Sequence, residues 1–362
     1  MGQPVNKILF VNSSWAPVQG GISDYIQMLA ASLGRLGRDV RVVTSSEFGI
    51  KPHQSTYLKV DPIISRWHRS RFLRVLPVLW SFHPDWIVLQ YPSEIPGRDS
   101  SLTPWVPVLS RWLYHQARVA YIVHEYADTL EINKPALRRA FRNSTVVFCF
   151  NESDRRALEL DGVNAIMSTI GSNILPVHHT SHKTDIKLNG FVYFGRQDER
   201  KGFGDLLLAL KRMPKLKLKA IGPIDARYHA EAARVGVAEQ IEWCGVLENA
   251  AVSNALQSAI ATIAPFRGGV RPNSSSVLAA LANGCRVITT LGDDTPDYLV
   301  NNNAVKLIKS GEVDQLILAV DGISSQITSA ETASLSATQS YLNWDTIGLD
   351  MLKTFEDYGK VS

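Results

Sequence analysis

Apolar and polar positions along the chain change in blocks that predict strands and helices in turn. Residues 7–12 form a short apolar run typical of a buried strand. Apolar side chains then recur at helical spacing over 22–36, and Gly37 ends that predicted helix. A second apolar run covers 39–44, so residues 7–44 predict one βαβ unit of a parallel sheet.

The rest of the first half continues in the same way. Apolar runs over 84–90, 118–123 and 145–150 predict three more buried strands, and 164–170 closes this half. Residues 171–188 lose the periodicity and carry Ser, His and Lys, which is typical of a linker between domains.

Beyond the linker the alternation begins again. The predicted elements are strand 191–194, helix 203–212, strands 217–221 and 240–243, helix 249–258, strand 260–264, helix 274–283 and strand 286–290. Two successive βα arrays predict an α/β protein of two doubly wound, Rossmann-like domains, with ligands bound between them. We place the domains at 1–172 and 189–340, the linker at 173–188, and a helical C-terminal segment at 341–362.

Composition narrows the functional classes only slightly. Hydrophobic residues make up 45% and charged residues 20% of 362 residues, which is typical of globular domains and enough for two cores. The 38 Lys and Arg exceed the 34 Asp and Glu by four, so the net charge of +4 is too small to predict a nucleic-acid partner. A weak positive field suits a phosphorylated ligand or an anionic membrane surface.

The cysteines and the apolar runs indicate in which cellular compartment the protein is expected. Cys149, Cys244 and Cys285 are scattered beside apolar runs, so we interpret them as buried reduced thiols without metal-ligand spacing. The first strand follows the N-terminus with no long apolar segment before it, which predicts no secretory signal. Since no apolar run approaches the ~18 residues of a spanning helix, we expect that the chain does not cross a membrane. The reduced thiols are in keeping with a cytoplasmic protein.

A charged turn after the strand 191–194 is the first candidate site. Gly195 and Gly202 enclose Arg196, Arg200 and Lys201, and a helix follows at once. Cations oppose the helix dipole at that end, so they fit best as partners of a bound phosphate. An ordinary charged surface turn explains the same residues and remains the alternative.

The first half offers two further candidates. Gly20 and Gly21 precede a helix and can let a phosphate or sugar approach the backbone, or can form a plain tight turn. His124 and Glu125 follow the strand 118–123 at its carboxyl end, where ligands collect in open α/β sheets. The alternative for His124 is a histidine that only completes local packing.

Residues 65–80 mix arginines with large apolar side chains. Four arginines alternate with Trp67, Phe72, Leu73 and Leu76, a mixture typical of a segment that lies on an anionic bilayer. A solvated basic helix with an apolar inner face is the alternative. We therefore expect peripheral contact with the inner face of the cytoplasmic membrane as one of two interpretations.

Several of these segments resemble the glycosyltransferases of the GT-B fold, specifically the large retaining group called family 4. Residues 194–203 are similar to the family's phosphate-binding turn, in which an arginine and a lysine hold the donor diphosphate. His124 resembles the histidine of its acceptor domain. Segments 7–44, 243–247 and 278–290 resemble its first βαβ unit, the strand and turn at the nucleotide base, and the segment beyond the donor.

One departure from the family pattern concerns the donor ribose. Many members carry two glutamates separated by seven residues, and the second is associated with the ribose. Their positions here hold Arg271 and Ala279, so ribose recognition must differ. The run 268–276 stands there instead, and we predict that Asn273 or Ser274 caps a helix whose free amides meet a diphosphate or a sugar hydroxyl. Serines that only cap a structural helix are the alternative.

The resemblance implies transfer of a sugar, with retention, from a nucleoside diphosphate sugar to a glycan or lipid-linked acceptor. It implies catalytic roles for His124, Arg196 and Lys201, with the cations stabilising the leaving diphosphate. The implied donor-binding residues are Gly195, Arg196, Lys201, Val246, Leu247, Arg271, Asn273, Ser274, Ser275 and Ser276, and the implied acceptor side is Gly20, Gly21, His124 and Glu125.

Further expectations follow from the same resemblance. The chain has no Asp-x-Asp metal motif, so we expect no required metal and no other cofactor. The helical segment at 341–362 is expected to cross back to the first domain, and domain closure to gate the chemistry. We expect a role in the biosynthesis of a bacterial surface polysaccharide such as lipopolysaccharide, capsule or exopolysaccharide. Two alternatives stay open: a sugar-nucleotide epimerase or hydrolase of the same fold, and a catalytically silent nucleotide-sugar-binding protein.

Overall fold

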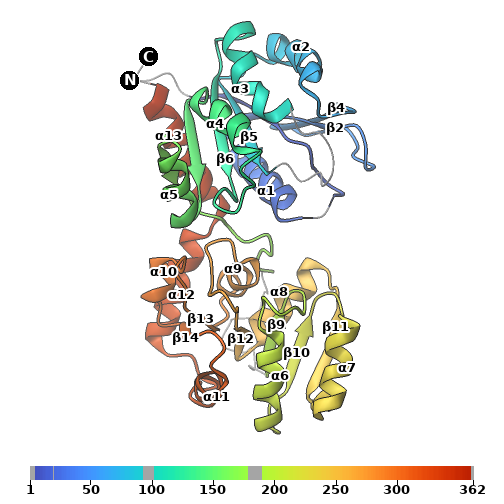
Figure 1. Cartoon of the computed structure of the whole chain (residues 1–362), viewed down its shortest axis with the longest axis vertical. Helices are drawn as coiled ribbons and strands as arrows, with labels where there is room; N and C mark the ends of the chain where they lie inside the picture. The colour runs from blue at the N-terminus through green and yellow to red at the C-terminus, as the bar shows by residue number, and fades with distance from the viewer. Residues whose placement is uncertain (1–4, 19, 93–101, 178–189, 360–362) are drawn as a thin grey trace. The chain divides into compact units, whose positions relative to one another are not determined.

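The computed structural model describes residues 5–18, 20–92, 102–177 and 190–359. The chain folds into two compact units (Figure 1). Unit 1 comprises Met1–Gly171 together with Trp344–Ser362, and unit 2 comprises Ser172–Asn343. The second unit therefore begins one residue before the predicted linker 173–188, of which only residues 173–177 are described.

Unit 1 is built on an eight-stranded sheet with the strand order β3-β4-β2-β1-β5-β6-β7-β8. All neighbouring strands are parallel except the pair β3 and β4. The strands are β1 (Lys7–Val11), β2 (Asp39–Ser45), β3 (His53–Gln54), β4 (Leu58–Ile64), β5 (Trp86–Tyr91), β6 (Arg118–Val123), β7 (Val146–Cys149) and β8 (Ala165–Met167). The chain leaves β1 toward one side of the sheet and returns at β5 on the other, so the strand order reverses between them.

Helices cover both faces of this sheet because successive side chains of each strand point to opposite faces. In β1, Ile8 and Phe10 pack toward α1 and α13, whereas Leu9 and Val11 pack toward α2, α3, α4 and α5. The helices are α1 (Gly21–Arg35), α2 (Phe72–Phe82), α3 (Leu102–Leu113), α4 (Lys134–Arg142), α5 (Glu152–Leu160) and α13 (Trp344–Gly359), with a 3-10 turn, η1 (Arg69–Arg71), before α2.

Unit 2 has a six-stranded, fully parallel sheet with the order β11-β10-β9-β12-β13-β14. Its strands are β9 (Phe191–Phe194), β10 (Leu218–Ile221), β11 (Ile241–Gly245), β12 (Ala261–Ala264), β13 (Val287–Thr290) and β14 (Val305–Ile308). Its helices are α6 (Phe203–Arg212), α7 (Ala226–Val235), α8 (Asn249–Ser258), α9 (Ser275–Ala282), α10 (Asp297–Val300), α11 (Val313–Asp321) and α12 (Ser329–Tyr341), with a 3-10 turn, η3 (Ala238–Gln240). The strand order reverses between β9 and β12, as it does between β1 and β5 in unit 1.

These two sheets confirm the predicted fold class of two doubly wound α/β domains. The sequence reading missed α7, which connects the predicted strands 217–221 and 240–243 and supplies the crossover that parallel neighbours require. It also missed β3 and β4, α3 and α4, and every element from α10 to α12. Cys149 and Cys285 are buried, but Cys244 is only half buried, which corrects that expectation.

The C-terminal segment differs from the prediction in one respect. The sequence predicts a helical segment at 341–362, but α12 ends at Tyr341 and α13 begins at Trp344. From there the chain packs on α1 of unit 1, where Ser32 Oγ donates to the carbonyl of Trp344 at 2.7 Å. A Cβ at Gly348 would lie 2.7 Å from Ser32 Oγ, so a larger residue would separate the two helices.

The segment 65–80 is neither one continuous helix nor apolar on its outer face. Of the four apolar side chains named in the sequence pattern, Trp67, Phe72 and Leu76 are buried in the core of unit 1 and Leu73 is 69% exposed, while Trp80 at the end of the segment is 57% exposed. The interleaved pattern is therefore mainly that of a basic surface over a packed inner face. Among the described residues, no helix combines the length and the apolar character that crossing a bilayer requires.

Phe355 provides a test of how strongly α13 stabilises unit 1. Its ring is fully buried and stacks on Trp86 with 4.1 Å between centroids and 10° between planes. We expect Phe355→Ala to lower the free energy of unfolding by about 3–5 kcal/mol, because it removes a large buried side chain and leaves a cavity. Urea unfolding followed by circular dichroism measures this change.

The matched control is Leu349→Ala in the same helix, where the side chain is 54% exposed. Its effect should stay within about 0.5 kcal/mol. Equal losses for the two variants would mean that α13 is not held by the Phe355 contact.

Candidate functional site

Two glycines shape the turn between β9 and α6. Gly202 has φ of 68° and serves as the N-terminal cap position of α6. A Cβ there would lie 1.8 Å from the carbonyl oxygen of Pro265, so no side chain fits. Gly195 has φ of 132°, and its backbone also contacts Gly222 beyond β10. The turn is therefore pressed against the loops that follow β10 and β12, at the point where the strand order reverses.

Polar contacts fix the shape of the same turn. Asp198 Oδ1 accepts the backbone N–H of Lys201 at 2.8 Å, and Asp198 Oδ2 lies 3.3 Å from the guanidinium of Arg196. Asp205, in the first turn of α6, pairs with both guanidinium nitrogens of Arg267 at 2.7 and 2.9 Å. These contacts hold the cations in place before any ligand arrives.

Lys201 is the most constrained cation of the turn. Its Nζ lies over Gly195, 2.6 Å from the position of an added Cβ, and 5.7 Å from the ring centroid of Phe266. Burial lowers the pKa of Lys201, nearby Arg200 and Arg196 lower it further, and Asp198 opposes the shift. Among the described residues no carboxylate pairs with its ammonium. A desolvated cation beside other cations favours an anionic ligand.

The run 268–276 leads into α9 at the same edge of the sheet. The helix begins at Ser275 with Ser274 in the N-cap position, but Ser274 makes no side-chain cap bond. Its Oγ instead accepts the backbone N–H of Arg271 at 2.9 Å, which corrects the predicted cap, and Asn273 is exposed. Gly269 packs on Gly292, where a Cβ would meet backbone at 2.4 Å.

The first turn of α9 offers unsatisfied donors. The N–H groups of Ser275 and Ser276 have no acceptor in the described part of the chain, as expected of a helix start. Ser276 is 2% exposed, and its Oγ has no hydrogen-bond partner among the described residues. Ala279, at the position of the second family glutamate, is fully buried within α9.

The remaining donor-side residues lie beyond β11. Val246 is 73% exposed, and Leu247 is half buried. The sequence reading missed Gln197, which is 2% exposed. Its Oε1 accepts the backbone N–H of Asp225 at 2.9 Å, whereas its Nε2 has no partner in the described structure. A glutamine between two charged residues is typical of a turn that faces solvent, so the sequence does not predict that Gln197 is buried.

In unit 1, His124 is enclosed by side chains from three elements. It is 7% exposed and lies just beyond β6. The ring of Tyr25 stands edge-on to it and that of Phe150 is tilted over it, each with 4.9 Å between centroids. Its Nε2 lies 3.2 Å from Gln90 Oε1. Burial lowers the pKa of His124 to about 3, so the ring is neutral at physiological pH.

The loop after His124 is held in place by hydrogen bonds to α5. Asp154, nearly buried in α5, accepts the backbone N–H groups of Tyr126 at 2.6 Å and of Ala127 at 2.7 Å. Glu125 is exposed between these fixed points. A Cβ at Gly21 would meet no atom within 4 Å beyond its chain neighbours and its own helix backbone, so packing does not require glycine at this position, whereas Gly20 has φ of 156°, a conformation that favours glycine.

Buried polar atoms without partners gather at these two edges. Ten such side-chain atoms occur in the described structure. Seven lie at or near the carboxyl ends of the sheets: those of Ser13, Ser14, Tyr25, Thr44 and Gln90 in unit 1, and those of Gln197 and Ser276 in unit 2. Since unpaired buried polar groups are costly, this concentration is typical of ligand-binding edges. Each predicted site residue stands near one of these edges, with the donor set in unit 2 and the acceptor set in unit 1.

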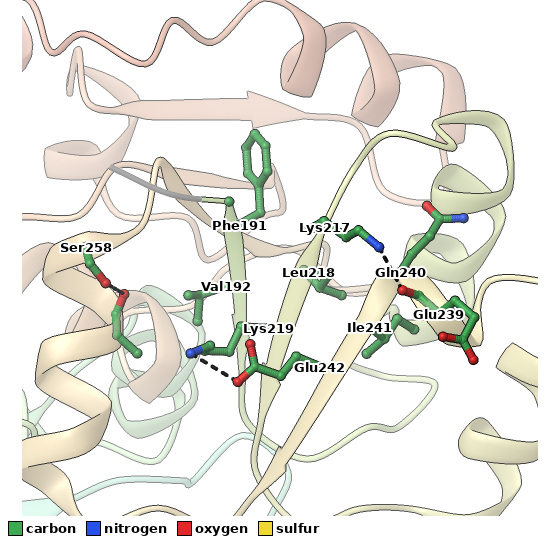
Figure 2. Close-up of a pocket in the computed structure, with 12 residues that line it drawn as sticks. Phe191, Val192, Lys217, Leu218, Lys219, Glu239, Gln240, Ile241, Glu242 and Ser258 are labelled. Atoms are coloured by element: carbon green, nitrogen blue, oxygen red, sulfur yellow. Dashed lines mark hydrogen bonds and ion pairs between the residues drawn. The ribbon is translucent and has the colours of Figure 1, made fainter. Parts of the chain in front are cut away.

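A separate pocket of about 400 Å³ lies at the opposite edge of the unit 2 sheet (Figure 2). It is lined by the first residues of β9, β10 and β11, and its lysines are already engaged: Lys217 Nζ donates to the Glu239 carbonyl at 2.9 Å, and Lys219 pairs with Glu242 at 3.2 Å. Ligands of doubly wound sheets bind beyond the carboxyl ends, so the charged turn is the better candidate.

Comparison with known proteins agrees with the fold. Residues 189–326 match the family model described as Glycosyl transferases group 1. The chain carries a group 1 glycosyltransferase domain. No curated protein matches the chain. The matched segment contains the whole donor-side set, from Gly195 to Ser276.

Solved structures show the same fold for the whole glycosyltransferase chain. A sucrose-phosphate synthase from Thermosynechococcus elongatus is 16% identical with a TM-score of 0.74, over 99% of this chain and 100% of that one. HepE from Anabaena, solved with UDP and glucose, is 14% identical with a TM-score of 0.68, over 97% and 100%. WaaG, involved in lipopolysaccharide biosynthesis, is 15% identical with a TM-score of 0.60, over 96% and 99%. These matches establish the GT-B fold.

A metal site requires several ligating side chains close together. Among the described residues, no three His, Cys, Asp or Glu side chains lie close enough together to hold a metal ion. The nearest carboxylate to Arg271 is that of Asp294, at 3.8 Å, so this aspartate in the loop after β13 is already engaged by a cation.

The pKa of His124 predicts how the stability of unit 1 depends on pH. The pKa falls from 6.5 in the unfolded chain to about 3 in the folded one, so the unfolded state binds the extra proton first. Stability is therefore full above pH 6.5 and is lost as the pH falls toward 3, by about 2 kcal/mol between pH 6.5 and 5. Urea unfolding at each pH measures the slope.

His124→Gln should remove this part of the slope, because the group that takes up the proton is gone. His53→Gln, at an exposed position of β3, is the control and should keep the wild-type slope. An unchanged slope for His124→Gln would contradict the burial of a neutral histidine.

Proposed function

We propose that this glycosyltransferase moves a sugar from a nucleoside diphosphate sugar to a glycan or lipid-linked acceptor, with retention at the anomeric carbon. The supporting observation is that the carboxyl edge of the unit 2 sheet holds a half-buried Lys201 with no paired carboxylate in the described structure, and that the run into α9 at this edge adds open amides and the unpartnered Ser276 hydroxyl. Such a set offers both charge and hydrogen-bond donors to a diphosphate.

In the proposed reaction, the group that most needs electrostatic stabilisation is the leaving diphosphate. Breaking the bond between sugar and phosphate develops negative charge on the diphosphate. Lys201 lies in a fixed, desolvated position, and Arg196 stands at the mouth of the same turn, so both can stabilise that charge without rearranging. In this proposal the cations do the work that a divalent metal does elsewhere.

The acceptor side is assigned to unit 1. His124 is neutral, so it can exchange hydrogen bonds with a sugar hydroxyl without bringing a charge. The open space at Gly21 allows a ligand to approach the backbone there. Retention belongs to the proposal because the chain resembles a retaining group, and the anomeric configuration of the product by proton NMR tests it.

Lys201→Met tests the diphosphate role. Removing one preorganised cation should lower turnover about 100- to 1000-fold. The same variant should lose the rise in Tm that UDP, GDP or ADP gives the wild type, since binding stabilises the folded state. UDP is the first nucleotide to try, because HepE was solved with it.

Lys211→Met is the matched control. Lys211 is exposed in the last turn of α6, away from the turn that precedes this helix. Its replacement should change neither rate nor Tm shift. Wild-type turnover by Lys201→Met would remove the diphosphate role, and hydrolysis or epimerisation of a nucleotide sugar without acceptor would favour the alternative enzyme class. Nucleotide binding with no turnover on any acceptor would favour a silent binding protein.

We further propose that the acceptor is carried at the cytoplasmic membrane face, as in the building of a surface polysaccharide. After burial is considered, the exposed apolar side chains on α2 are Leu73 and Trp80, with Arg74 exposed beside them. The neighbouring helix α3 exposes Trp112 at 80% and Leu113 at 49%. Exposed tryptophans beside arginines suit the interface of an anionic bilayer.

Vesicle binding tests this surface. The wild type should sediment with anionic vesicles at low salt, stay in solution with neutral ones, and be released at high salt. Trp80→Ala and Arg74→Ala should each weaken binding to anionic vesicles. Loss of the arginine alone should cost about 1 kcal/mol of binding free energy, or about fivefold in vesicle affinity. Leu208→Ala, at an exposed apolar position of α6, is the control. Equal recovery with neutral and anionic vesicles would end the membrane proposal.

A further inference from the structure

We propose that Gln90 is a positioning residue for His124: its side-chain carbonyl accepts the His124 Nε2–H, fixes the neutral ring in one tautomer and leaves Nδ1 as the acceptor for a sugar hydroxyl. This inference rests on the function proposed for His124. It adds a residue that the sequence reading did not select and that nothing in the family pattern quoted above includes.

The parallel register of β5 and β6 brings the two residues together. Gln90 pairs with Ile122, and Tyr91 pairs with Val123, so His124 follows directly beyond the last pair. The His124 backbone N–H extends this ladder by donating to the Tyr91 carbonyl at 2.8 Å. Gln90 is 1% exposed, and its Oε1 faces His124 Nε2 at 3.2 Å.

Aromatic rings occupy other sides of the imidazole. Tyr25 meets it edge-on at an interplanar angle of 83°, and Phe150 lies over it at 32°. Tyr25 is itself held by edge contacts with Phe150 and with Trp344 of α13. None of the groups in contact with the ring carries a charge, and burial raises the pKa of the Tyr25 hydroxyl far above its usual range. The ring therefore has a single polar side-chain partner among the described residues, Gln90.

That partner decides which nitrogen carries the proton. A neutral imidazole has one N–H and one lone pair, and an amide oxygen can only accept. With Gln90 Oε1 toward Nε2, the proton sits on Nε2 and Nδ1 becomes the acceptor. A hydroxyl group can donate to such a nitrogen. The Gln90 Nε2 group remains without a partner in the described structure, so the amide is not held by another side chain in competition with His124.

The proposal makes opposite predictions for two substitutions. Gln90→Met keeps the volume and removes the acceptor, so the Nε2–H loses its partner and the tautomer is no longer fixed. Gln90→Glu keeps an acceptor but adds a negative charge, which raises the pKa of His124 because it favours the imidazolium. The control is Val88→Ala, at a fully buried position on the same face of β5, two residues before Gln90.

The first experiment observes the ring directly, without activity. In full-length protein labelled with ¹⁵N-histidine, two-dimensional NMR distinguishes the two tautomers of His124. We expect Nε2–H in the wild type and in Val88→Ala, with no titration between pH 5 and 8. We expect mixed tautomers in Gln90→Met and a titration within that range in Gln90→Glu. A wild-type ring with the proton on Nδ1, or an unchanged ring in Gln90→Met, would overturn the proposal.

The second experiment measures turnover of a nucleotide sugar. Gln90→Met should lose about 10- to 100-fold in kcat, because a misoriented contact costs that much. The turnover of Gln90→Glu should recover at pH 8 and should fall as the pH drops through the raised pKa of His124. The turnover of Val88→Ala should keep the wild-type pH profile. Full activity of His124→Ala with the expected tautomer in the wild type would remove the sugar role of His124 but leave the Gln90 contact standing. Equal pH profiles for Gln90→Glu and the wild type would overturn the role of Gln90.

Discussion

Parallel pairing of strands is the constraint on which both units depend. Each crossover brings the chain back to the amino end of the next strand, so all connections that leave the carboxyl ends share one edge of the sheet. Where the strand order reverses, between β1 and β5 and between β9 and β12, neighbouring connections diverge and leave room for a ligand. The orphaned polar atoms gather at these edges because strands can bury apolar residues along their length but not the groups beyond their ends.

In unit 2, backbone contacts place the turn that contains Lys201 at the point where the strand order reverses. Gly202 packs closely on the backbone of Pro265, and Gly195 packs closely on that of Gly222. These contacts fix the position of the turn relative to the sheet. Lys201 lies across this turn and loses part of its hydration, which makes an uncompensated cation costly in the free protein. Under the proposed function, a bound diphosphate relieves that cost. The nearby Asp205, in the first turn of α6, is already paired with Arg267 at 2.7 Å.

Local patterns in the sequence predicted much of this, and burial explains what they did not. The strand 191–194, the glycines around Lys201 and the helix after them were all readable, because a turn between a strand and a helix is a local feature. Gln90 and Gln197 were not, since a polar residue inside or beside a strand carries no local sign that its side chain faces a buried partner. The same limit applies to 65–80, where the arginines are evident in sequence but the burial of Trp67 and Phe72 depends on α3 and the sheet. Capping failed for a similar reason: Ser274 occupies the cap position, yet the nearby Arg271 N–H competes for its hydroxyl.

The absent glutamates follow from the packing of α9 as well. Ala279 is fully buried and its helix is closely packed, so a longer side chain there would have to displace neighbours before it could reach a ligand. The position of the first glutamate holds Arg271, which lies 3.8 Å from Asp294 and is cationic like Lys201. Donor recognition at this edge, under the proposed function, relies on cations and amides, which meet phosphate, rather than on carboxylates, which would meet ribose hydroxyls. Under the proposed function, the turn that contains Lys201 supplies a larger share of donor binding than it would beside a ribose-binding glutamate, and discrimination between nucleotides falls to the groups beyond β11.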